Sequence, residues 1–251
     1  MIGQEFLKTL FLNLLMICVV IPLLVYCTYA FMLYFSFRKS SYSDFNKRFI
    51  KVLFDKGARG EFKIFRLLEK LVDKYSKGMA FIVPNVYVQK GNSETSEVDI
   101  VLVAPSGIVV VESKNYAGSV YGKIDEKFWT QVLPGKKSRF LNPLIQNEGH
   151  VKALSEFLKL PKESFRSVVV FPDSCNLKVE RPVSNKVVLV KFSELPKVVK
   201  QFLSEPKIFT LGEVFQFNKV LVERSLVDEE IKRTHIEKVK EKRASWQRSL
   251  D

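Results

Sequence analysis

Three charged side chains lie near the ends of two apolar segments, residues 98–104 and 107–114, that are joined by a short turn. Asp99 is at the start of the first segment, and Glu112 and Lys114 are at the end of the second. The intervening Pro-Ser-Gly sequence predicts a β-hairpin. A turn centred between its proline and its serine places Asp99 opposite Glu112 and Glu97 opposite Lys114.

This register has a chemical consequence. Side chains alternate between the faces of a strand, and directly opposed residues project to the same side, so Asp99, Glu112 and Lys114 should share one face. Two facing carboxylates repel each other unless a cation lies between them. A lysine beside that cation completes a site of one metal and one ammonium group, which suits the hydrolysis of a phosphodiester bond.

The other metal-binding residue types are scarce. The chain has three cysteines and two histidines, and none has the spacing of a zinc site or of a disulfide framework. His150 and His235 are far apart in sequence, which disfavours a histidine-based nuclease. Any catalytic metal must then be held by oxygen atoms, which predicts Mg²⁺ or Mn²⁺.

The acid, the turn and the Glu-x-Lys sequence together resemble the PD-(D/E)xK nuclease superfamily. Within it, the chain resembles the nuclease-related domain (NERD) family over roughly residues 55–160. Five blocks in the family's order carry the resemblance: Gly57-x-x-Gly60-Glu61, Asp99, the run from Gly107 through Glu112-Ser113-Lys114-Asn115 to Gly118, Trp129, and Asn142-Pro143-Leu144-x-Gln146-Asn147. The chain departs from the family pattern at Val98-Asp99-Ile100, where Ile-Asp-His is usual, and at Ser113, where threonine is commoner.

The resemblance implies an α/β fold, with a restriction-endonuclease-like central mixed β-sheet flanked by helices. It also assigns roles. Asp99 and Glu112 would hold the metal with the carbonyl of Ser113, and Glu61 would complete or extend the metal site. Lys114 would orient the attacking water or contact the scissile phosphate, and Gln146 would position water or phosphate. The substrate would be nucleic acid, with DNA favoured over RNA.

Two of these residues have alternative interpretations. Glu61 lies on the apolar stripe of a helix expected over about residues 57–75, where an acid needs a partner such as a metal. It could instead be a first-turn acid that stabilises the helix N-terminus. Gln146 lies in the first turn of a helix that begins at Asn142-Pro143, with His150 one turn further on the same face. It could also be an ordinary polar surface residue.

The charge of the chain is unevenly distributed. Lys and Arg number 40 against 27 acids, a net charge of +13, and residues 1–37 hold only Glu5 and Lys8. The excess therefore belongs to residues 38–251. A basic region suits a polyanion such as nucleic acid, or an anionic lipid surface. Simple solubility next to a membrane is the alternative.

Residues 9–37 form a run of 29 residues without a charge. About 20 suffice to cross a bilayer, and Pro22 is tolerable in a membrane helix. A cleaved signal peptide is the rival interpretation, but its apolar core would span only about 7–15 residues. The basic residues that follow are Arg38, Lys39, Lys47, Arg48 and Lys51. Positive charge favours the cytoplasmic side. We therefore expect a single-pass protein of the cell membrane whose domain faces the cytoplasm.

The chain then divides into an N-terminal transmembrane anchor (1–37), a basic connector (38–55), a nuclease-like domain (56–210) and a charged, helical, solvated tail (211–251). Within the domain we expect strands at 81–89, 128–133, 167–171 and 186–190, with Pro84 marking an edge or a bulge. Residues 91–97 read as a polar loop, and Ser193 as the cap of a helix that reaches residue 203. The rival to an enzyme is a non-catalytic module that binds nucleic acid or a protein at the membrane. A membrane-surface scaffold that uses the C-terminal helix is a third possibility.

Overall fold

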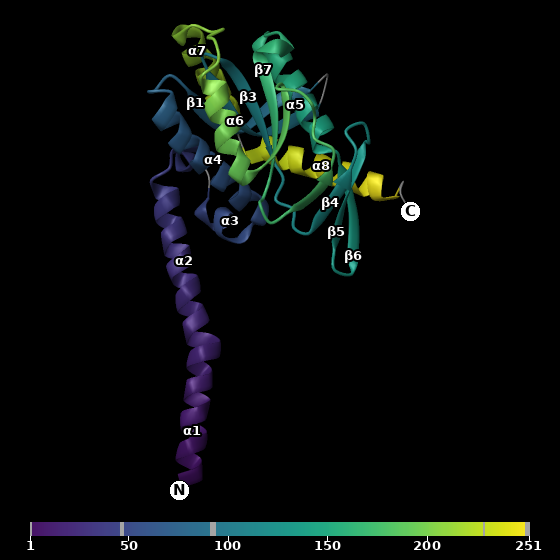
Figure 1. The fold of residues 1–251 in the computed structure, drawn as a ribbon. Coiled ribbons are helices and arrows are strands. Elements are labelled where there is room, and N and C mark those ends of the chain that lie inside the picture. Colours follow the sequence, from purple (N-terminus) through teal and green to yellow (C-terminus); the bar gives the residue numbers. More distant parts are fainter. Residues whose placement is uncertain (1, 46–47, 91–93, 228, 249–251) are drawn as a thin grey trace.

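The computed structural model describes residues 2–45, 48–90, 94–227 and 229–248. It has a long N-terminal helical rod that projects from an α/β body (Figure 1). The rod consists of α1 (Ile2–Leu15), a π-helical turn η1 (Met16–Val20) and α2 (Ile21–Arg38). The π-turn ends just before Pro22, whose missing N–H removes one hydrogen bond of a regular helix.

The rod has the dimensions and composition of a membrane span. The apolar stretch Gly3–Arg38 is 36 residues long, and none of its most apolar part is buried against the rest of the chain. Large apolar side chains such as Phe11, Leu24 and Met32 are exposed along it. The helix is therefore long and apolar enough to cross a bilayer, a test that signal sequences also pass.

The connector after the rod is packed against the body. It holds the 3₁₀ turn η2 (Ser41–Phe45) and the short helix α3 (Phe49–Phe54). Its side chains Tyr42, Phe45 and Val52 are buried in the main core. Glu69 of α4 (Lys56–Tyr75) accepts hydrogen bonds from Ser40 Oγ at 2.7 Å and from Ser41 N at 2.8 Å, so polar contacts also hold the connector in place.

Two mixed sheets form the body. The first has the strand order β1-β2-β3-β7-β9, with β1 (Phe81–Lys90), β2 (Glu94–Ala104), β3 (Gly107–Ser113), β7 (Phe165–Phe171) and β9 (Val187–Lys191). The second has the order β6-β5-β4-β8, with β4 (Ser119–Gly122), β5 (Phe128–Leu133), β6 (Lys136–Leu141) and β8 (Asn176–Val179). The predicted α/β class with helices around a mixed sheet is confirmed.

The register of the β2–β3 hairpin is the one that the turn at Pro105 and Ser106 predicts. Five pairs are formed, from Ala104↔Gly107 to Ile100↔Val111. The next position along this ladder places Asp99 across from Glu112. β1 is an edge strand, as Pro84 suggested, and its pairing with β2 is interrupted at Asn85, which has a φ of 48°.

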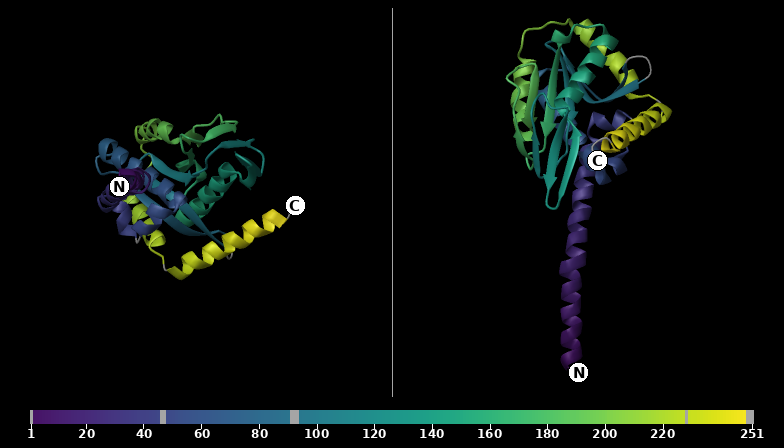
Figure 2. Two further views of the ribbon diagram at one scale, coloured as in Figure 1. Left: turned by 90° about the horizontal axis from the view of Figure 1, so that it is seen from below. Right: turned by 90° about the vertical axis from the view of Figure 1, so that its right-hand side faces the viewer.

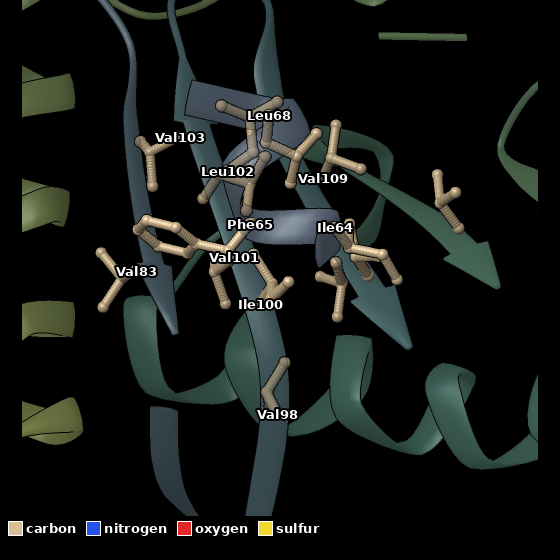
Figure 3. Close-up of a cluster of buried hydrophobic side chains, with 14 of the residues drawn as sticks. Ile64, Phe65, Leu68, Val83, Val98, Ile100, Val101, Leu102, Val103 and Val109 are labelled. Atoms are coloured by element: carbon tan, nitrogen blue, oxygen red, sulfur yellow. The ribbon is translucent and has the colours of Figure 1, made fainter. Parts of the chain in front are cut away.

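Helices cover both faces of the first sheet. α4 contacts α6 (Leu195–Leu203) on one face, and α5 (Pro143–Leu158) packs on β7 and β3 from the other (Figure 2). The core around the sheet is apolar, and Phe65 and Leu68 of α4 belong to the same buried cluster as Val101 and Leu102 of β2 (Figure 3). Two 3₁₀ turns, η3 (Lys162–Ser164) and η4 (Phe192–Glu194), precede β7 and α6.

Four details differ from the sequence-based expectation. β2 begins at Glu94, inside the expected polar loop, because residues 94–98 pair with the second half of β1; residues 91–93 of that loop lie outside the described residues. The short strand β8 was not predicted. Residue 193 belongs to η4, and Glu194 is the residue that precedes α6. The expected solvated tail contains α7 (Leu211–Ser225), which packs on β1 and buries Val214 and Leu221, followed by α8 (Glu229–Arg248).

Candidate active site

The candidate site lies where β2 and β3 leave their shared ladder. Beyond the last backbone pair, a side chain in place of the backbone links the two strands: the backbone N–H of Ser113 donates a hydrogen bond to Asp99 Oδ2 at 2.8 Å. This bond fixes the Asp99 carboxylate beside the strand that carries Glu112 and Lys114. The predicted proximity of Asp99 and Glu112 thus has a local structural cause in the hairpin.

Glu112 is almost completely buried, with 2% of its surface exposed. Its Oε1 accepts from Lys114 Nζ at 2.6 Å and from Gln146 Nε2 at 2.8 Å. Its Oε2 lies 3.2 Å from His150 Nε2. Burial by itself would raise the pKa of Glu112, but the charge of Lys114 and the contact with His150 outweigh it and lower the pKa to about 2. Glu112 is therefore ionised at neutral pH.

Gln146 connects the two charged groups. Its Oε1 accepts from Lys114 Nζ at 3.0 Å while its Nε2 donates to Glu112. Burial lowers the pKa of Lys114, but the carboxylates of Glu112 and Asp99 outweigh it, and the pKa is raised. The ammonium group is thus held charged, in a fixed position.

The start of α5 places Gln146 at the site. Asn142 caps this helix by accepting from Leu144 N at 2.9 Å, and its own amide donates to the carbonyls of Ile124 and Glu126 at 2.9 and 2.8 Å. Pro143 occupies the first turn, as its fixed φ allows. Asn147 then donates to Val110 O at 2.9 Å and Ser167 Oγ at 2.8 Å, which fastens the helix to β3 and β7.

Asp99 is in the opposite electrostatic situation from Glu112. Burial raises its pKa well above the ordinary value, and the negative charges of Glu112 and Glu61 raise it further, against the smaller lowering effect of Lys114. Ionisation of Asp99 is thus unfavourable unless a further cation lies nearby. Such a carboxylate is stabilised by a cation.

Glu61 approaches the site from α4 without joining the hydrogen-bonded group around Glu112. Its Oε2 accepts from Asn85 Nδ2 at 3.3 Å, and the same amide donates to Glu97 Oε1 at 2.9 Å. Tyr87 also donates to Glu97, at 2.6 Å. The charge of Glu61 acts on Asp99. Glu61 is therefore near the site but is tied to a neighbouring polar cluster.

The donor set fits a hard divalent cation. Among the described residues, no three His, Cys, Asp or Glu side chains are grouped so as to hold a metal. The oxygen atoms available are the carboxylates of Asp99 and Glu112 and the backbone carbonyl of Ser113, and oxygen ligands are those that Mg²⁺ and Mn²⁺ prefer. Glu112 Oε2 is buried, and its 3.2 Å contact with His150 Nε2 lacks the geometry of a regular hydrogen bond. The site is therefore an open pair of carboxylates, and solvent or substrate would supply the remaining ligands.

Sequence reasoning assigned no role to two neighbours of the site. His150 is buried and lies with its Nδ1 2.7 Å from Ser96 Oγ. The only signal for it was its position one turn after Gln146. Tyr42 of the connector lies close enough to Glu61, Asp99 and Glu97 that burial and these charges raise its pKa. Nothing in the sequence indicated this contact.

Comparison with known proteins agrees with the geometry. The nuclease-related domain family matches residues 56–172. An uncharacterized protein of Bacillus anthracis is 30% identical over 181 residues, which cover 72% of this chain and 82% of that protein. No solved structure matches the chain. The matched residues contain Glu61, Asp99, Glu112, Lys114 and Gln146, and the chain belongs to the nuclease-related domain (NERD) family.

Proposed function

We propose that this protein is a membrane-anchored, metal-dependent nuclease that hydrolyses phosphodiester bonds, with DNA as the favoured substrate. The observation that carries the proposal is the arrangement of Glu112, Lys114 and Gln146, joined by contacts of 2.6–3.0 Å, with Asp99 opposite on the paired strand. Family membership and the basic composition of residues 38–251 support it.

Each residue of the site would have a distinct role in the reaction. Asp99, Glu112 and the Ser113 carbonyl would hold Mg²⁺ or Mn²⁺, and Glu61 would extend the site from α4. Bound there, the ion would lower the pKa of a water molecule and offset charge on the transition state. Lys114, kept protonated by its carboxylate neighbours, would contact the scissile phosphate or orient the water. Gln146 would hold Lys114 in place and position the same groups.

The test uses the full chain in detergent, incubated with labelled DNA and RNA. We expect cleavage with Mg²⁺ or Mn²⁺ that stops with chelator. Glu112→Gln and Lys114→Met should each lose most of the activity, while Lys152→Ala, an exposed change on the same helix as Gln146, should keep it. Melting curves followed by tryptophan fluorescence check that the variants fold. Unchanged cleavage by both site variants would refute the assignment.

A non-catalytic module is the second candidate, and one observation favours it: within the described part of the chain, no set of three acidic or histidine side chains forms a ready metal cage. Mn²⁺ binding distinguishes the two. A rise in Tm with Mn²⁺ that disappears in Asp99→Asn supports the enzyme. A wild-type protein that binds DNA but neither binds Mn²⁺ nor cleaves supports the module.

The rod would anchor this nuclease to the cell membrane, with the domain on the cytoplasmic side. The charge step from Lys8 to the basic residues after Phe37 supports this orientation. The same residues suit anionic headgroups, at about 1 kcal/mol each near the surface. Protease added to intact cells should leave the domain uncut and digest it after permeabilisation. Digestion in intact cells would show the opposite orientation.

A further inference from the structure

A pocket of about 330 Å³ adjoins the candidate site at the carboxyl ends of β3 and β7. These two strands are parallel neighbours, and ligands in open α/β sheets bind at this end of the strands. The first turns of α4, the segment after β7 and Phe192 form its other walls. Ser113 and Lys114 line this pocket and also belong to the candidate site. A molecule that fills the pocket would therefore touch the strand that carries the proposed chemistry.

The walls combine positive charge with an aromatic ring. Arg59 and Lys63 are four residues apart on α4, so they lie on the same side of the helix, and both line the pocket. Phe192 lines it as well and is only partly buried. The single acid of the lining, Asp173, accepts hydrogen bonds from Ser193 N at 3.0 Å and Ser193 Oγ at 2.7 Å. With Lys114, three basic side chains line the pocket against this one acid, so its net charge is positive.

A close approach of the backbone shapes this wall. A Cβ on Gly60 would lie 3.2 Å from Asn115 Cβ, tighter than an ordinary contact. The Asn115 side chain donates to the carbonyl of Lys56. The absence of a side chain at Gly60 therefore lets α4 sit directly on the end of β3 and brings Arg59 and Lys63 to the strand that bears Lys114.

We propose that this pocket is the subsite for one unpaired nucleotide that flanks the scissile phosphate. Arg59 and Lys63 bind the phosphate of that nucleotide, and Phe192 stacks on its base. The proposal rests on the proposed nuclease function, because a strand with one phosphate at Lys114 must place its next nucleotide close to the shared wall. The volume is at the small end for ligand pockets, so it admits one nucleotide and excludes a duplex.

The subsite predicts a preference among nucleic acids. A base can enter the pocket only if it is unpaired, so single strands and frayed ends bind better than an intact duplex. Aromatic stacking is independent of base identity, because every base has a π-face. The pocket thus prefers single-stranded over double-stranded nucleic acid and does not discriminate between base sequences.

The test measures binding by the full chain in detergent, by fluorescence anisotropy, to a labelled 12-nucleotide DNA strand and to the matched duplex. Chelator is present throughout, so no cleavage occurs and the result does not depend on activity. Phe192→Ala should weaken single-strand binding by about 5- to 150-fold, and Phe192→Tyr should not. Duplex binding should change less than single-strand binding in Phe192→Ala.

The phosphate contacts are tested by salt. The double variant Arg59→Ala/Lys63→Ala should reduce the slope of log K against log salt by about 0.7 for the single strand, since the two side chains share one phosphate and each lost phosphate contact accounts for about 0.7. Lys70→Ala, an exposed change on the same helix outside the pocket, should leave the slope unchanged.

Three outcomes overturn the subsite: an unchanged salt slope in the double variant, equal losses for single strand and duplex in Phe192→Ala, or equal wild-type binding of both substrates. If Phe192→Ala is unfolded at room temperature, the salt slope of the Arg59→Ala/Lys63→Ala variant alone decides whether the subsite exists. A wild-type protein that shows the predicted binding but never cleaves with any metal refutes the nuclease proposal and leaves the pocket as a nucleotide-binding site.

Discussion

Replacing Asp99 with asparagine should make the metal-free protein more stable while abolishing its proposed activity. The side chain keeps its shape. Its carbonyl oxygen can still accept a hydrogen bond from the backbone N–H of Ser113, which lies 2.8 Å from Asp99 Oδ2 in the wild type. Only the charge is lost. Because that charge is buried and faces Glu112 and Glu61, the folded protein is relieved of a repulsion that the unfolded chain does not experience.

The size and sign of the change in stability caused by Asp99→Asn follow from the raised pKa of Asp99. A carboxyl group whose pKa is higher in the folded state stabilises the fold fully below its ordinary pKa, and this contribution is lost as the pH rises through the folded value. Each pKa unit corresponds to about 1.4 kcal/mol. One kcal/mol shifts Tm by about 2–4 °C in a domain of this size. We expect Asp99→Asn to raise Tm by at least about 3 °C at pH 8 and by almost nothing at pH 4.

The assay is thermal melting in chelator, repeated with millimolar Mn²⁺. The cation should stabilise the wild type by offsetting the charge of Asp99, and it should stabilise Asp99→Asn much less. Glu112→Gln is the matched comparison: the pKa of Glu112 is about 2, so its charge stabilises the fold above its ordinary pKa, and its loss should lower Tm at pH 8. If Asp99→Asn melts at or below the wild-type temperature at pH 8 in chelator, the proposed repulsion does not exist.

Three further changes test other parts of the structure. His150→Gln, whose amide can replace Nε2, should retain cleavage, whereas His150→Asn should lose about 10- to 100-fold in metal affinity or activity; equal behaviour of the two would show that Glu112 needs no partner there. Leu221→Ala should lower the free energy of unfolding by about 2–5 kcal/mol, measured by urea unfolding, because α7 is part of the core; no change would mean that α7 is a loose tail. Glu69→Ala should lower the free energy of unfolding by about 1–3 kcal/mol, since it leaves Ser40 and Ser41 without their hydrogen-bond acceptor. Hydrogen bonds lower the pKa of Glu69 despite its partial burial, so this difference should shrink as the pH falls below the ordinary glutamate pKa.

The local parts of this site could be predicted from the sequence. A two-residue turn fixes the register of a hairpin, and a period of two then decides which side chains share a face, so the pairing near Asp99 and Glu112 followed from Pro105 and Ser106 alone. The start of α5 was equally readable, because Asn142 and Pro143 are local helix-start signals. Both predictions depend on neighbours within a few residues.

The parts that depend on long-range packing could not be predicted. β8 has four residues, and its place is set by pairing with β4, far away in sequence. From the sequence alone, α7 was grouped with the more strongly charged residues that follow it, and only the burial of Val214 and Leu221 shows that this helix belongs to the core. Tyr42 reaches the acidic groups because the connector folds back on α4, which no periodicity in residues 38–55 indicates.

The two facing carboxylates are made unlike each other by their surroundings. Glu112 is surrounded by Lys114, Gln146 and His150, and its pKa is low; Asp99 receives one backbone N–H and faces two other acids, and its pKa is high. Titratable neighbours whose environments separate their pKa values are typical of catalytic sites. In the proposed site each would have a distinct role: Glu112 would be a permanent negative charge, and Asp99 would be the group whose ionisation a bound cation favours. A purely structural ion pair would need only the Glu112–Lys114 contact. Asp99 is not required for such a pair, and its buried carboxyl group costs stability when ionised, so we infer that its presence serves the cation that it would help to bind.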